Sequence, residues 1–183
     1  MTRLRPLERP WPDWFASAMD RTMPPGMEPL SLFRTIAHSE RAWSKFSAGS
    51  LLDKGPLAFR DREIVINRTA ARCGCSYEWG VHAKLFGERA GLSQRQLEAT
   101  AKAEVDADIW SPAELILLEA VDRLLDSKRL SDPEYDRLAE HFSEEQILEI
   151  VQLVAFYHGV ALICGAFDIA PEPGMPPLPS SGE

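Results

Sequence analysis

The chain is poor in cysteine and carries no recognisable targeting segment. Only three of its 183 residues are cysteine, too few for a disulfide framework, which favours a reducing compartment. No uninterrupted apolar run approaches the roughly 18 residues that cross a bilayer. The first residues, MTRLRPLERPWPDW, lack the apolar core of a signal peptide. We therefore expect a cytoplasmic protein with no membrane partner.

Basic residues are also scarce. Lysine and arginine number 20 against 28 acidic residues, giving a formal net charge of -8. Proteins that bind nucleic acid without sequence specificity use a cationic surface to displace counterions from phosphates. The charge balance argues against such a partner and favours a small molecule.

Signals for β-strands are weak, whereas helix starts are frequent. Capping-box pairs stand at Ser93/Gln96, Ser111/Glu114 and Ser143/Gln146. Apolar residues recur at helical spacing after them. We predict helices over Asp13 to Met19, Glu28 to Ala48, Asp61 to Arg72, Ser76 to Ala90, Ser93 to Ala103, Ser111 to Ser127, Asp132 to Phe142 and Ser143 to Ile169.

These helices predict an all-α bundle. The length fits one domain, which we place at residues 1–170 with an N-terminal arm at its start. Residues 171–183, PEPGMPPLPSSGE, contain five prolines and cannot continue a helix. They form either an extended tail or an arm laid on a neighbour.

The segment REIVINRTAARCGCSYEWGVH concentrates reactive side chains on two consecutive helices. Glu78 and His82 stand four positions apart, so they share one helix face. The short connection between the helices makes them neighbours, which brings Glu63 within reach. Cys75 stands just before the second helix. We take Glu63, Cys75, Glu78 and His82 as the candidate catalytic residues.

A solvated helix face is the alternative interpretation of the Glu78/His82 pair. In that case Arg62 and Arg68 are surface charges as well. The neighbours of Glu63 and Glu78 are mostly large and apolar, however, which is typical of buried helices. A buried glutamate needs a partner, and histidine or arginine would supply one.

The segment resembles the carboxymuconolactone decarboxylase and alkyl hydroperoxidase D superfamily. That superfamily has a helix with a glutamate, followed by a helix with the pattern Cys-x-x-Cys-x-x-x-His. Glu63, Cys75 and His82 match the pattern, whereas Glu78 stands where the second cysteine would be. The resemblance extends from about Leu30 to the last predicted helix with Tyr157. It implies an alkyl hydroperoxidase D-like bundle of about six to eight helices, assembled as a homotrimer or hexamer.

Because Glu78 replaces a cysteine, the resemblance implies the decarboxylase-type branch rather than a dithiol peroxidase. We expect a lyase that uses a Glu/His acid-base relay, without metal or organic cofactor, on a small carboxylated substrate. His82 is then the general acid/base, and Arg68 or Arg72 holds the substrate carboxylate. Tyr77 and Trp79 complete the predicted substrate contacts.

Other interpretations stay open. Cys75, at a helix N-terminus, has the position of a reactive thiol, and Cys73 is its nearest partner in an alkyl hydroperoxidase-like antioxidant or peroxidase. Cys164, in an apolar run, reads as buried and inert. A noncatalytic oligomer with the same fold is a further possibility. Zinc is disfavoured because Cys73 and Cys75 are closer in sequence than the ligands of most structural sites.

Overall fold

The computed structural model describes residues 2–180, and these form an all-α structure without strands. The last three residues of the predicted tail, 181–183, lie outside the described part. The helices are α1 Asp13–Thr22, α2 Ser31–Ile36, α3 Glu40–Ala48, α4 Phe59–Arg72, α5 Ser76–Phe86, α6 Gln94–Ala99, α7 Pro112–Ser127, α8 Asp132–Ala139 and α9 Glu144–Phe167, with a 3₁₀ turn at Ala107–Ile109. The predicted all-α class is confirmed.

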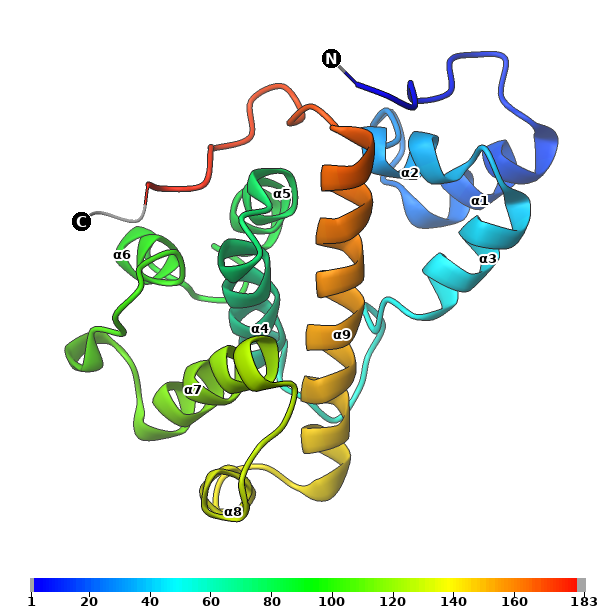
Figure 1. Cartoon of the computed structure of the whole chain (residues 1–183). Helices are drawn as coiled ribbons and strands as arrows, with labels where there is room; N and C mark the ends of the chain where they lie inside the picture. Colours follow the sequence, from blue (N-terminus) through cyan, green and yellow to red (C-terminus); the bar gives the residue numbers. More distant parts are fainter. Residues whose placement is uncertain (1, 181–183) are drawn as a thin grey trace.

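Helix α9 is the axis of the bundle. It runs the length of the molecule, with α4, α5 and α7 on one side and the α1–α3 group on the other (Figure 1). This 24-residue helix contains an 18-residue window with a mean hydropathy of 1.9, so it is long and apolar enough to cross a membrane. The search of the sequence for an uninterrupted apolar run did not find this helix, because Gln152 and His158 interrupt its apolar residues. A core helix passes the same test, so the finding alone does not indicate a membrane segment.

The predicted helix from Glu28 to Ala48 is wrong as a single element, because the chain forms α2 and α3 instead. Helix α2 starts only after Pro29 and Leu30, whose backbone is extended. Ser39 then adopts an extended conformation, and its hydroxyl accepts a hydrogen bond from Ala42 N, which caps α3. This break lets the N-terminal arm fold back over α5 and α9.

Helices α4 and α5 are joined by a tight connection that the sequence predicted correctly. Gly74 has a φ of 65°, a left-handed conformation that suits glycine. Cys75 follows as the N-cap of α5. Every residue of α4 from Glu63 to Ala70 is buried, since the helix packs against α5, α7 and α9. Polar side chains on this helix are therefore enclosed.

The proline-rich tail lies on α5 of the same chain over its described length. Leu178 N donates to Ser76 Oγ at 3.0 Å. The carboxylate of Glu172 accepts hydrogen bonds from Ser31 N and from the hydroxyl of Tyr77. A methyl group at Gly80 would lie 2.4 Å from the carbonyl oxygen of Pro176, so only glycine permits this approach.

Candidate functional site

Glu63, His82 and Glu78 form a continuous chain of polar contacts. Nδ1 of His82 lies 2.7 Å from Glu63 Oε2, and Nε2 lies 3.2 Å from Glu78 Oε1. The three residues are 0%, 3% and 6% exposed. They therefore occupy an enclosed site, and the open charged face considered as an alternative is wrong for Glu78 and His82. Helix packing brings Glu63 from α4 to α5, as the short connection predicted.

Arg62 extends this chain on the side away from Glu78. Its Nε and Nη2 each lie 3.3 Å from Glu63 Oε1. Its Nη1 donates to the carbonyl oxygens of Leu51, Leu52 and Asp53. The side chain is only 11% exposed, so Arg62 is a buried partner of Glu63 rather than a surface charge.

The two carboxylates keep His82 protonated. Burial alone lowers the pKa of His82, but the charge of Glu63, hydrogen bonds to Glu63 and Glu78, and the charge of Glu78 outweigh it. The pKa rises from 6.5 to about 9. With Arg62 and His82 positive and Glu63 and Glu78 negative, the formal charges of the four groups cancel.

Glu78 and His82 open onto an internal cavity of about 460 Å³. The cavity lies between the N-terminal arm, α5 and α9, and its volume is typical of a small-molecule site. Its walls are mostly apolar and aromatic, and the acidic and basic side chains among its described lining residues are Glu78 and His82. The lining residues are Thr22, Met23, Pro24, Met27, Leu30, Leu32, Phe33, Trp43, Phe46, Ser47, Ser50, Leu52, Glu78, Val81, His82, Leu85, Phe86, Phe156 and Tyr157.

The cavity has an exposed rim and a buried end. Met27 and Leu52, each 41% exposed, mark its rim, whereas Glu78 and His82 lie at its buried end. The His82 ring is held there between Phe86, at 5.0 Å, and Tyr157, which meets it edge-on at 5.2 Å. A molecule entering from the rim would meet the polar chain last.

The cysteines are arranged differently from the expectation. Cys75 is buried and does not line the cavity, and Cys73 is half-buried beside another hollow with Arg72 and Asp126. The thiol of Cys75 is hydrogen-bonded to that of Cys164, which lowers the pKa of Cys75 and raises that of Cys164. Backbone amides of Glu78 and Tyr77 lower the pKa of Cys75 further, against the effect of burial. The nearest thiol partner in space is Cys164, not Cys73.

The two arginines predicted to hold a substrate carboxylate lie outside the cavity. Arg68 is fully buried, where it pairs with Asp122 at 2.5 Å and donates to the carbonyl oxygens of Thr100 and Lys102. Arg72 is exposed and pairs with Asp122 and Asp126. Their guanidinium groups are therefore committed to α7 and its neighbouring loop.

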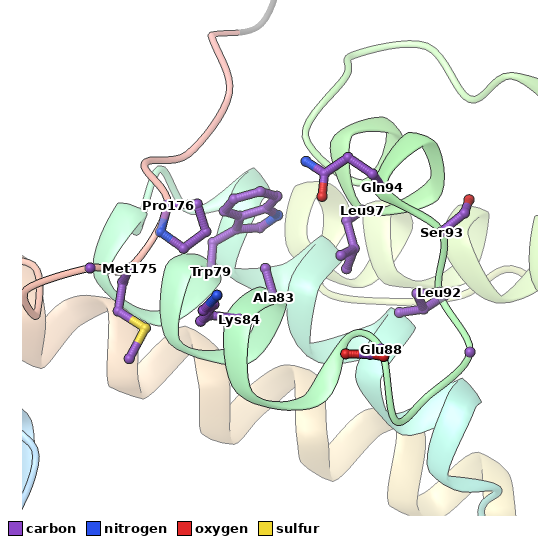
Figure 2. A pocket seen from close by; sticks show the side chains of 12 residues that line it. Trp79, Ala83, Lys84, Glu88, Leu92, Ser93, Gln94, Leu97, Met175 and Pro176 are labelled. Carbon is purple, nitrogen blue, oxygen red and sulfur yellow. The ribbon is translucent and has the colours of Figure 1, made fainter.

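Tyr77 and Trp79 also point away from the cavity. The Tyr77 hydroxyl donates to Glu172 at 2.6 Å and accepts from Leu32 N, and burial raises its pKa. Trp79 Nε1 donates to Thr100 Oγ1. Trp79 lines a separate groove between α5, α6 and the tail, with Leu97, Met175 and Pro176 around it (Figure 2). This groove, about 770 Å³, is larger than the cavity but contains none of the polar chain.

Among residues 2–180, no group of three or more histidine, cysteine, aspartate or glutamate side chains is arranged to hold a metal ion. Sequence reasoning expected a histidine or arginine partner for a buried glutamate but did not identify Arg62, and it missed Trp43 and Phe46 as lining residues. The aromatic content of the N-terminal arm was the only available hint, since nothing in helical periodicity shows which bundle face an arm covers.

Part of the chain matches a known protein family. The model of the carboxymuconolactone decarboxylase family matches residues 37–122, which include Glu63, Glu78 and His82. An uncharacterized Bacillus subtilis protein, YdfG, is 28% identical over 95 residues. That match spans 51% of this chain and 63% of YdfG, less than two thirds of its length.

Solved structures share the fold at low sequence identity. A peroxidase-related protein from Silicibacter sp. TM1040 is 18% identical with a TM-score of 0.77, covering 95% of this chain and 93% of that one. One from Ralstonia eutropha JMP134, described as an alkylhydroperoxidase AhpD core, is 21% identical with a TM-score of 0.77 and covers 93% of each chain. The debrominase Bmp8 is 19% identical with a TM-score of 0.71 and covers 94% of each. Residues 37–122 thus match the carboxymuconolactone decarboxylase family, and the chain has the fold of the alkyl hydroperoxidase D-like structures.

Proposed function

We propose that the protein is a cofactor-free acid-base enzyme that transfers a proton to and from carbon in a small molecule. The observation that carries the proposal is the unbroken contact chain from Glu63 through His82 to Glu78, which ends at the wall of a cavity. Enclosed polar chains with a shifted pKa are typical of catalytic sites.

The arrangement assigns roles that differ from those expected from the sequence. Both ring nitrogens of His82 are occupied by carboxylates, and Glu78 is the carboxylate that lines the cavity, so we assign it the role of the base. Glu78 would take a proton from a carbon next to a carbonyl, and the electron pair of the broken C–H bond would move to the carbonyl oxygen. The positive charge of the His82 imidazolium, rather than a direct hydrogen bond from it, would stabilise this enolate, and Glu78 would return the proton to carbon.

Decarboxylation of a carboxylated lactone would need only the second of these steps, the protonation of an enolate on carbon. Loss of carbon dioxide leaves an enolate, and the proton that it takes up would come from the His82 imidazolium through Glu78. This narrower reaction has less support than proton transfer within an uncharged substrate, because Arg68 and Arg72 do not reach the cavity. Bmp8 has been crystallised with 2,3,4-tribromopyrrole, an aromatic ring without a carboxylate.

A panel of cyclic ketones, lactones and carboxylated lactones in D₂O tests the proposal. We expect deuterium at the carbon beside the carbonyl, or loss of carbon dioxide, to be detected by NMR with the parent protein. His82→Ala should slow this turnover by about 10²-fold or more, because the relay is interrupted. Equal turnover by the parent and His82→Ala across the panel would refute the acid-base role.

The thiol peroxidase alternative is favoured by one observation, the lowered pKa of Cys75 beside Cys164. Its weakness is access, since Cys75 is 6% exposed and outside the cavity lining. Cys75→Ser separates the two functions in the same panel with a peroxide added. Deuterium exchange at carbon should persist in Cys75→Ser. Loss of peroxide consumption in Cys75→Ser would instead favour the thiol reaction.

The protonation of His82 predicts the alkaline side of the pH profile. The imidazolium is present below its pKa, so kcat should be constant toward neutral pH and fall as pH rises through about 9. Glu63→Gln removes the largest influence that raises this pKa. The alkaline limb should then move to lower pH by about one unit or more. An unchanged limb in Glu63→Gln would show that His82 does not control it.

A further inference from the structure

The charge of the cavity restricts which molecules it accepts. Among the described lining residues, none is lysine, arginine or aspartate, and the charged ones are Glu78 and His82. His82 is already in contact with two carboxylates, and the nearby Arg62 is bound to Glu63 and three carbonyl oxygens. Each positive charge near the cavity is thus already neutralised.

A bound anion would therefore have no counterion. An incoming carboxylate would leave water, enter walls made largely of aromatic and aliphatic side chains, and lie close to the Glu78 carboxylate. Burial of an unpaired charge is costly, and a like charge nearby increases the cost. A neutral carbonyl or hydroxyl group avoids both penalties, and a hydroxyl group also donates a hydrogen bond to the Glu78 carboxylate at the buried end.

We propose that the cavity binds an uncharged, largely apolar ring compound with one carbonyl or hydroxyl group, and rejects the carboxylate of the same shape. This inference specifies the substrate class of the proposed acid-base function and rests on it for its catalytic meaning. Trp43, Phe33 and Phe46 supply flat surfaces for a ring, and Glu78 and His82 meet its polar group.

A matched pair of probes tests the rejection of charge. We would titrate 2-acetylnaphthalene and 2-naphthoate at pH 7.5 by isothermal calorimetry, which measures binding without turnover. The ketone should bind at least tenfold more tightly than the carboxylate. Equal affinities, tighter binding of the carboxylate, or binding of neither probe would overturn the inference.

Two variants of the protein test where the probes bind. Ser47→Arg places a cation on an exposed position of the cavity lining, and Ser44→Arg places one a turn earlier on α3, outside the lining. Only Ser47→Arg should tighten naphthoate binding, by about tenfold, with the ketone affinity of both variants near that of the parent. An equal gain in the two variants would indicate general surface attraction and overturn the assignment to this cavity.

These binding results are separate from the proposed reaction. Selective ketone binding without deuterium exchange in any compound would retain the ligand class and refute the acid-base function. Exchange or decarboxylation limited to carboxylated lactones, together with equal probe affinities, would retain the function and refute the ligand class.

Discussion

Replacing Glu78 by glutamine should reduce kcat by about 10² to 10⁴, the range expected for loss of a general acid-base group. The amide has nearly the shape of the carboxylate but cannot accept a proton at neutral pH. Glu78 also lines the cavity, whereas Glu63 contacts His82 and does not line it. The effect should therefore appear in kcat, with little change in KM.

Glu88→Gln is the matched control for this experiment. Glu88 is exposed and lines the separate groove by α6, so the same change of charge occurs away from the polar chain. We expect kcat of this variant to equal that of the parent. If Glu78→Gln and Glu88→Gln have the same kcat, the cavity glutamate has no part in the chemistry.

Asp122→Asn should lower the free energy of unfolding by about 3 kcal/mol, because it leaves the guanidinium of Arg68 buried without its counterion. Arg68 is fully enclosed, and both of its contacts to Asp122, at 2.5 and 2.7 Å, involve charged oxygens. For a domain of this size the melting temperature should fall by roughly 6–12 °C. Thermal unfolding followed by circular dichroism measures the effect.

Asp126→Asn provides the comparison one turn further along α7. Asp126 pairs with the exposed Arg72 and is itself 58% exposed, so its loss should cost less than about 0.5 kcal/mol. Below its melting temperature, Asp122→Asn should keep the parent's KM, since Arg68 does not face the cavity. Equal melting temperatures for the two variants, or a KM raised only by Asp122→Asn, would contradict this structural role.

Much of the bundle was predictable because its helices carry their own start signals. Ser93, Ser111 and Ser143 cap helices in the structure with the reciprocal contacts that their sequence spacing indicates. Their interactions are local, within three residues. Ser39 caps α3 without a glutamate or glutamine three positions later, so the break before α3 had no comparable signal.

The contacts of the site that were predictable are those between residues close together in the sequence. The contact of Glu78 with His82 follows from one helical turn, and that of Glu63 with His82 follows from a short connection. The partners of Arg68 and Cys75 depend on packing against α7 and α9 instead. Residue spacing within one segment cannot indicate that Asp122 lies beside Arg68 or that Cys164 lies beside Cys75.

The contacts of Arg62 join a loop at the cavity rim to the buried helix α4. One guanidinium holds the carbonyl oxygens of the loop at Leu51, Leu52 and Asp53, and the same group contacts the buried carboxylate of Glu63. Leu52 in that loop forms part of the cavity rim. Arg62 thus connects one edge of the cavity rim directly to the buried end of the polar chain.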